Sequence, residues 1–113
     1  MTHGNELSDE QLTELLGSHL LVGLTYLRPD GELAERLQFH GTVESVGEDV
    51  VAVRRADNGE VFTLPSMPET YEPAPRGEYR LKGAGEVVVD PDFMCTMTVH
   101  LPRGVRPGQP FEV

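Results

Sequence analysis

The residue types that could bind a metal are scattered along the chain. Its four histidines are His3, His19, His40 and His100. No two of these histidines have the short spacing that would let a single helix or strand place both rings on one metal. His40 and His100 fall on the polar sides of their predicted strands, so they could meet near Asp90 or Asp92 as a two-histidine, one-carboxylate site. We weigh this against ordinary solvated histidines and expect the latter, with no bound metal.

Two carboxylates flank a proline in the run Asp90-Pro91-Asp92. Such a pair could ligate a cation or act as a general acid and base. Aspartates that bracket a proline are, however, typical turn formers, because their side chains bond nearby backbone amides. The pattern therefore predicts a turn between two strands.

Support for nucleophilic or cofactor-dependent catalysis is weak. The single cysteine, Cys95, lies in an alternating run of apolar and polar residues, which predicts a buried thiol. The serines and threonines have no recognisable nucleophile elbow or paired histidine. The glycines of residues 82–85 match part of a dinucleotide loop but precede a strand, where such a site needs a helix. We expect no catalytic residues, no cofactor and no enzymatic activity.

A proline-rich segment offers the best candidates for a binding surface. Met67, Tyr71 and Tyr79 lie in or beside residues 65–78, which contain four prolines and no periodicity. Aromatic and methionine side chains provide contact area at low entropic cost, so these three could line a groove over the sheet. The alternative is that they only anchor a long loop to the core.

The chain is strongly acidic, with 19 Asp and Glu against 9 Lys and Arg and a net charge of −10. Nucleic acid phosphates and anionic lipid are therefore disfavoured as partners, and a basic protein is favoured. Glu44, Glu48 and Asp49 are the candidates for an acidic face. No stretch approaches the roughly 20 apolar residues that cross a bilayer, and the first residues are acidic where a signal peptide is basic. We expect a cytoplasmic protein that does not bind membranes.

The first elements are a helix and a strand. Ser8 and Gln11 form a capping box with a hydrophobic staple, and Gly17 is a suitable stop, which predicts a short helix over about residues 8–17. Leu12, Leu15 and Leu16 would form its apolar stripe. Residues 20–27 then form an apolar strand that ends at a Pro-Asp-Gly turn.

A β-meander follows. Residues 33–46 alternate, with Phe39 and Val43 on the core face, but Gly41 and the phase of Val46 predict a bend or bulge after Gly41. Residues 50–55 and 60–64 form a hairpin around Asn58-Gly59. Its register stays open between a two-residue loop and a three-residue loop with Gly59 left-handed.

The rest of the chain adds short strands and a tail. After the loop of residues 65–78, strands are expected at 79–81, 86–89 and 93–100, followed by a flexible tail, 101–113. Most of the core is predicted to consist of Leu24, Leu37, Phe39, Val43, Val53, Phe62, Leu64, Phe93, Met97 and Val99.

This element order, a helix before five to six short strands with the second long and bent, resembles that of small SH3-like and Sm-like barrels over residues 8–100. The resemblance implies a mainly β fold, a small antiparallel barrel with one short N-terminal helix. We expect residues 1–100 to form a single domain. Barrels of this type include peptide binders, RNA binders and scaffolds, so the fold does not determine the function.

Our leading interpretation is a non-enzymatic, acidic protein-interaction module, for example an inhibitor or immunity-type protein that occupies the phosphate-binding face of a nuclease. One alternative is a small-molecule-binding barrel or minor enzyme that uses residues 65–78 as a lid. A second alternative is an RNA-binding barrel, which the charge opposes. The chain is expected to be a monomer or a homodimer.

Overall fold

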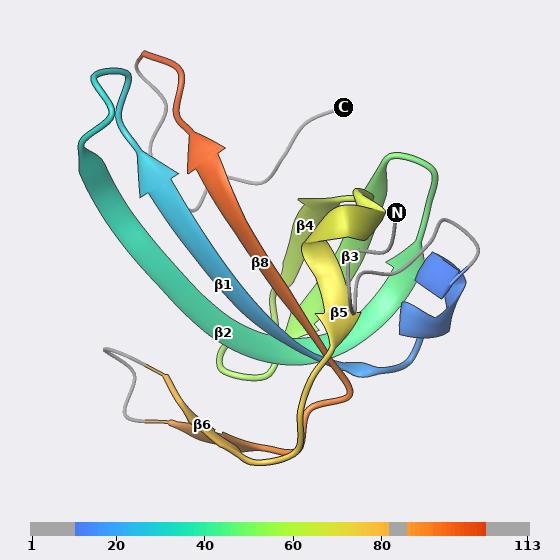
Figure 1. The fold of residues 1–113 in the computed structure, drawn as a ribbon. Helices are drawn as coiled ribbons and strands as arrows, with labels where there is room; N and C mark the ends of the chain where they lie inside the picture. Colours follow the sequence, from blue (N-terminus) through green and yellow to red (C-terminus); the bar gives the residue numbers. More distant parts are fainter. Residues whose placement is uncertain (1–10, 82–85, 104–113) are drawn as a thin grey trace, which may run out of the picture.

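The computed structural model describes residues 11–81 and 86–103 and is mainly β, as predicted. A curved sheet of six strands has the order β4-β3-β2-β1-β8-β5, and β6 and β7 form a separate two-stranded hairpin (Figure 1). The strands are β1 His19–Leu27, β2 Leu33–Val46, β3 Val50–Arg55, β4 Val61–Pro65, β5 Tyr71–Pro73, β6 Glu78–Arg80, β7 Val87–Val89 and β8 Phe93–His100. Two short 3-10 helices, η1 Gln11–Leu15 and η2 Pro68–Thr70, complete the described elements.

The expected N-terminal helix is described only from Gln11 onward, and there it is a 3-10 helix; the capping box at Ser8 lies outside the described residues. Gly17 ends it with φ +79° and donates its N–H to the carbonyl of Val43 at 2.9 Å. Leu12 and Leu15 are buried as predicted. The prediction for Leu16 is wrong, since its side chain is 60% exposed.

The long strand β2 matches its predicted bounds and carries the predicted irregularity. Its pairing with β3 shifts register between Val43 and Ser45, so Glu44 is the extra residue of a bulge. Nearby, Gly41 faces the β3 backbone so closely that a Cβ would lie 2.1 Å from the carbonyl oxygen of Arg54. Only glycine permits this close approach, which lets β2 bend and pair with both β1 and β3.

The β3–β4 hairpin adopts neither of the two registers considered. Val51 pairs with Leu64 and Val53 with Phe62, and the N–H of Arg55 bonds the carbonyl of Glu60. The loop therefore has four residues, 56–59, with Gly59 at φ +73°. This register places Val51, Val53, Phe62 and Leu64 in the core.

The sheet is not wholly antiparallel, which corrects the prediction. β1 pairs with β8 in parallel along its length, from Leu20 with Phe93 to Leu27 with His100. All other pairs within the described residues are antiparallel. A parallel pair needs a crossover connection, and the segment between β1 and β8 contains all the other strands of the described residues.

The segment 65–78 is shorter as a loop than expected, because it contains η2 and strand β5. β5 pairs with β8 through Tyr71 and Cys95, and so forms one edge of the sheet. The other edge is β4, and the hydroxyl of Tyr71 donates to the carbonyl of Pro65, its last residue, at 2.9 Å. The predicted tail starts too early, since Leu101 is buried and its N–H bonds the carbonyl of Leu27.

The main core fills the inner side of the curved sheet. Of the predicted core residues, Leu37, Phe93, Met97 and Val99 are only partly buried, and the others are buried. Buried residues that the prediction omitted include Leu20, Val22, Tyr26, Val51, Tyr71 and Leu101. A second, smaller cluster lies on the outer side, where the β6–β7 hairpin covers Leu21 with Leu81 and Val88.

Candidate functional site

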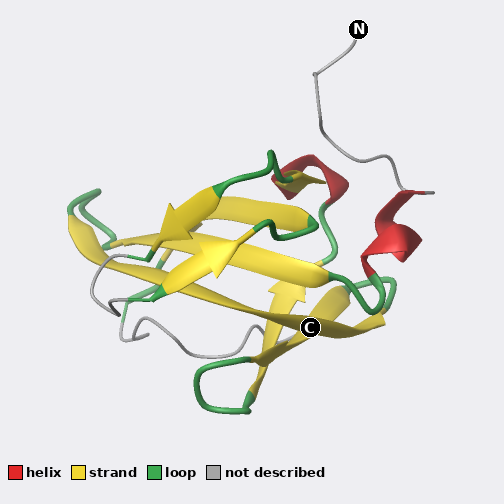
Figure 2. Ribbon diagram, turned by 90° about the horizontal axis from the view of Figure 1, so that it is seen from below, coloured by secondary structure: helices red, strands yellow, loops and turns green. Residues whose placement is uncertain are grey.

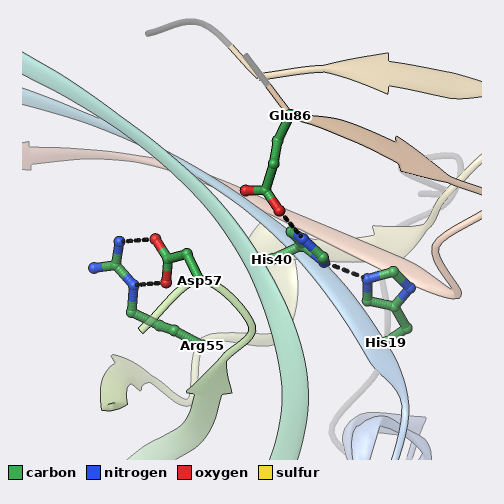
Figure 3. A network of polar contacts seen from close by, with 5 residues as sticks. All are labelled: His19, His40, Arg55, Asp57 and Glu86. Carbon is green, nitrogen blue, oxygen red and sulfur yellow. Dashed lines mark hydrogen bonds and ion pairs between the residues drawn. The ribbon is translucent and has the colours of Figure 1, made fainter. Parts of the chain in front are cut away.

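Three titratable side chains from distant parts of the chain lie in contact with one another (Figure 3). Nε2 of His19, at the start of β1, lies 2.8 Å from Nδ1 of His40 on β2. Nε2 of His40 lies 2.9 Å from a carboxylate oxygen of Glu86, the residue before β7. His40 is largely buried, with 16% of its side chain exposed. We call these three residues the histidine network.

The contacts fix the proton positions when both rings are neutral. His40 must donate its Nε2–H to the Glu86 carboxylate, which makes its Nδ1 an acceptor for the Nε2–H of His19. Burial lowers the pKa of His19, the neighbouring His40 lowers it further, and Asp92 opposes the change. The network therefore favours a neutral His19, and it links the hairpin to the main sheet.

The expectation of an ordinary solvated histidine is wrong for His40, which is largely buried and contacts His19 and Glu86. The alternative site of His40 with His100 does not form either. His40 is level with Leu21 on β1, and His100 is level with Leu27, six residues further along the strand. At about 3.3 Å per residue, roughly 20 Å separates them.

Asp90 and Asp92 form a turn, as predicted. A carboxylate oxygen of Asp90 accepts the N–H of Gly77 at 2.8 Å, and one of Asp92 accepts the N–H of His19 at 2.8 Å. Asp90 has φ +46°, a conformation that aspartate tolerates in turns. These bonds hold the end of β7 and the start of β1 in place.

The groups needed for nucleophilic catalysis are not assembled around the network. Both ring nitrogens of His40 are already bonded within it, so neither can take a proton from a nucleophile in this arrangement. Cys95 is buried against the core, and burial raises its pKa to about 12. Within the described ranges, no three His, Cys, Asp or Glu side chains are grouped as metal ligands.

The three candidate groove residues are not brought together. Tyr71 is completely buried in the main core, with its hydroxyl bonded to Pro65. Tyr79 packs with the second cluster under the hairpin and bonds the carbonyl of Pro75. Met67 is 42% exposed beside η2. Tyr71 therefore anchors its segment, the alternative considered above, and offers no contact surface to a partner.

The candidate acidic residues divide into two groups. Glu44 forms an ion pair with Arg54, so its charge is compensated. Arg55 likewise pairs with Asp57, whose pKa it lowers by hydrogen bonding (Figure 3). Glu48 and Asp49 are exposed in the β2–β3 turn. That turn is tied to Ser66, which donates its N–H to the carbonyl of Asp49 and its hydroxyl to that of Gly47.

Glu48 and Asp49 belong to an end of the molecule rich in carboxylates. Both short helices lie there (Figure 2), and they contribute Glu14 from η1 and Glu69 from η2. A cavity of about 480 Å³ is lined by Leu12, Thr13, Val46, Gly47, Glu48 and Ser66. We call η1, the turn of residues 47–49 and residues 66–70 the acidic end.

Sequence reasoning named Glu48, Asp49 and Met67 as binding candidates, and these lie at the acidic end, but it did not relate His19 or Glu86 to His40. His19 precedes the apolar run of β1 and Glu86 precedes β7, and neither spacing relates them to His40. Only the register of β1 with β2 and the folding back of the hairpin bring them together. No sequence signal short of the full topology could have identified the network.

No helix in the described part of the chain is both long and apolar enough to span a bilayer.

Comparisons of this chain with protein-family models, with curated proteins and with solved structures find no match.

Proposed function

We propose that this protein is a non-enzymatic interaction module whose acidic end binds a basic protein surface. The observation that carries the proposal is the charge of this end. Its described residues include Glu14, Glu48, Asp49 and Glu69 and no lysine or arginine. The described arginines belong to other segments: Arg28, Arg36, Arg54, Arg55, Arg76, Arg80 and Arg103.

Apolar area accompanies the charge. Leu12 and Val46 line the cavity of the acidic end, Met67 is exposed within it, and Leu16 is exposed next to η1. A partner with alternating basic and apolar side chains would satisfy both features, because charge steers the encounter and apolar contact slows dissociation. One concrete form is an inhibitor or immunity-type protein that covers the phosphate-binding face of a nuclease.

At the level of fold, we infer a partly open barrel of the SH3-like and Sm-like kind. The bond between Tyr71 of β5 and Pro65 of β4 supports this inference, since it joins the two edges of the sheet. Barrels of this type host many functions, and the binding of peptides and other proteins is among them.

The test uses a labelled peptide of alternating lysine and leucine and a matched pair of double variants. Glu48→Lys/Asp49→Lys reverses two charges at the acidic end, and Glu60→Lys/Glu78→Lys reverses two charges elsewhere. The first should slow association about tenfold or more, and the second much less. Raising the ionic strength from about 0.02 to 0.5 M should slow association by the parent protein at least tenfold.

NMR titration with the same peptide should shift amides of residues 11–16, 46–49 and 66–70. Shifts confined to other segments, or equal effects of the two double variants, would contradict the proposal. Binding of single-stranded RNA with higher affinity than the peptide would favour the RNA-binding alternative.

A further inference from the structure

The outer face of the main sheet carries a groove that the acidic end does not include. One hollow of about 390 Å³ is lined in part by Thr25, Arg36 and Thr98. A second, of about 310 Å³, lies between the sheet and the β6–β7 hairpin. The two share Gly23, Gln38 and Thr96 in their linings, so they are neighbouring parts of one surface, which we call the outer-face groove.

Strand register explains how the groove is built. Gly23 of β1 pairs with Gln38 of β2 on one side and Thr96 of β8 on the other, and all three face away from the core. Because Gly23 has no side chain, the floor between its neighbours is recessed. A Cβ at this position would meet only a methyl group of Thr96, at an ordinary 3.8 Å, so the backbone does not require glycine here.

The groove is apolar at one end and polar at the other. Under the hairpin its wall consists of Leu21, Tyr79, Leu81 and Met94. Toward the open end it consists of the hydroxyls of Thr25, Thr96 and Thr98, the amide of Gln38 and the guanidinium of Arg36. A groove of this volume whose wall combines apolar side chains with a few polar groups is typical of sites for small organic molecules.

The arginines determine the sign of the ligand's charge. Arg36 and Arg80 line the two hollows, and neither forms an ion pair within the described residues, although the chain has a large excess of carboxylates. Glu78 is the one acidic residue in the described lining. Glu35, next to Arg36, alternates to the other face of β2. Two arginines against one carboxylate favour an anion.

We propose that the outer-face groove binds a small amphipathic organic anion, with its apolar body under the β6–β7 hairpin and its carboxylate or phosphate group at Arg36 and Arg80. The net charge of −10 opposes polyanions such as nucleic acid much more strongly than a single small anion. The site is separate from the acidic end and does not depend on the function proposed for it.

The experiment uses the fluorescent probe 8-anilinonaphthalene-1-sulfonate, which has an aromatic body and one anionic group. The uncharged analogue N-phenyl-1-naphthylamine, which lacks the sulfonate, is the chemical control. The parent protein should bind the sulfonate with 1:1 stoichiometry and a Kd on the order of tens of micromolar, as expected for about twenty non-hydrogen atoms. The uncharged analogue should bind about tenfold more weakly.

Three variants locate the site. Gly23→Leu fills the floor and should abolish binding, and Arg36→Gln/Arg80→Gln should weaken it about tenfold without affecting the uncharged analogue. Arg103→Gln removes an arginine that lines neither hollow and should change nothing. The near-UV circular dichroism spectrum and Tm of each variant show whether it is folded, and the arginine variants alter only exposed side chains.

Displacement of the probe by decanoate, 4-phenylbutyrate and phenyl phosphate distinguishes aliphatic carboxylates, aromatic carboxylates and phosphate esters as ligands. The proposal is overturned if the probe does not bind, if folded Gly23→Leu binds it as the parent does, or if the uncharged analogue binds equally well. An equal loss in Arg103→Gln and Arg36→Gln/Arg80→Gln would also overturn it, since it would show an effect of overall charge.

Discussion

The carboxylate of Glu86 lies 2.9 Å from Nε2 of His40, and this contact fastens the β6–β7 hairpin to the main sheet. Glu86→Ala should therefore loosen the hairpin locally. Because the pair is partly exposed, we expect about a fivefold increase in amide hydrogen exchange in β6 and β7 and little change in Tm. Glu78→Ala, on the same hairpin but without a described ion pair, is the control. Equal exchange in both variants would contradict a fastening role for Glu86.

Stability should depend on the protonation of His19. Burial lowers its pKa below the ordinary 6.5, so the folded state binds fewer protons than the unfolded state between the two values. The contribution of neutral His19 to the free energy of unfolding is therefore complete above about pH 6.5, and it is lost as the pH falls toward the lowered pKa. Tm measured between about pH 7.5 and 5.5 should fall less steeply in His19→Gln than in the parent. Equal slopes in the two proteins would contradict a lowered pKa at His19.

Two glycines of the sheet should respond differently to the same substitution. Gly41→Ala places a Cβ 2.1 Å from the carbonyl oxygen of Arg54, and the backbone must move to relieve the clash. We expect a loss of about 1 to 3 kcal/mol in the free energy of unfolding. Gly23→Ala meets only ordinary contacts and should be neutral or slightly stabilising. Urea denaturation measures both, and similar losses would mean that β2 and β3 are not so closely apposed.

The hydroxyls of Tyr71 and Tyr79 should contribute differently to the free energy of unfolding. Tyr71→Phe removes the bond to Pro65 in the interior, where burial raises the pKa of the phenol and keeps it protonated. The cost should be about 1 kcal/mol. Tyr79→Phe removes an exposed bond to Pro75 and should cost less than about 0.5 kcal/mol. A larger loss at Tyr79 in urea denaturation would show that the edge-to-edge bond of Tyr71 contributes little.

Phe39 is the centre of an aromatic contact in the main core. The centroid of its ring lies 5.0 Å from the centroid of the Phe62 ring. Cζ of Arg55 lies 4.5 Å from the centroid of the Phe39 ring. Phe39→Ala or Phe62→Ala should each cost about 3 to 5 kcal/mol, measured by chemical denaturation. Leu33→Ala, at a position 48% exposed, should cost well under 1 kcal/mol. A loss below about 1 kcal/mol at both phenylalanines would contradict the described core.

Local patterns predicted the meander well because its determinants are local. Alternation gave the bounds of β2, and Gly41 marked the bend, since a glycine within a strand indicates a close backbone approach. The four-residue hairpin loop was missed because Asn58-Gly59 is compatible with several loop lengths, and a two-residue loop would place the same residues, Val51, Val53, Phe62 and Leu64, on the core face.

The parallel pair of β1 with β8 and the histidine network could not be predicted from the sequence. Each depends on contacts between segments far apart along the chain, for which periodicity carries no information. The strand β5 was missed for a different reason. The three residues of β5, Tyr71–Pro73, end in a proline and are too few to show alternation, and Tyr71 is held there by β8 and by Pro65.

The parallel pairing of β1 with β8 has a consequence for synthesis on the ribosome. One edge of β1 stays unpaired until residues 93–100 have been made, because β8 is its partner there. Translating residues 28–92 takes on the order of several seconds. Throughout that interval an apolar strand with free N–H and carbonyl groups is exposed, which is the form of chain that aggregates or recruits chaperones. Pairing of this edge of β1 therefore waits for residues 93–100 and requires the long segment 28–92 to close as a loop, a non-local contact of the kind that slows folding.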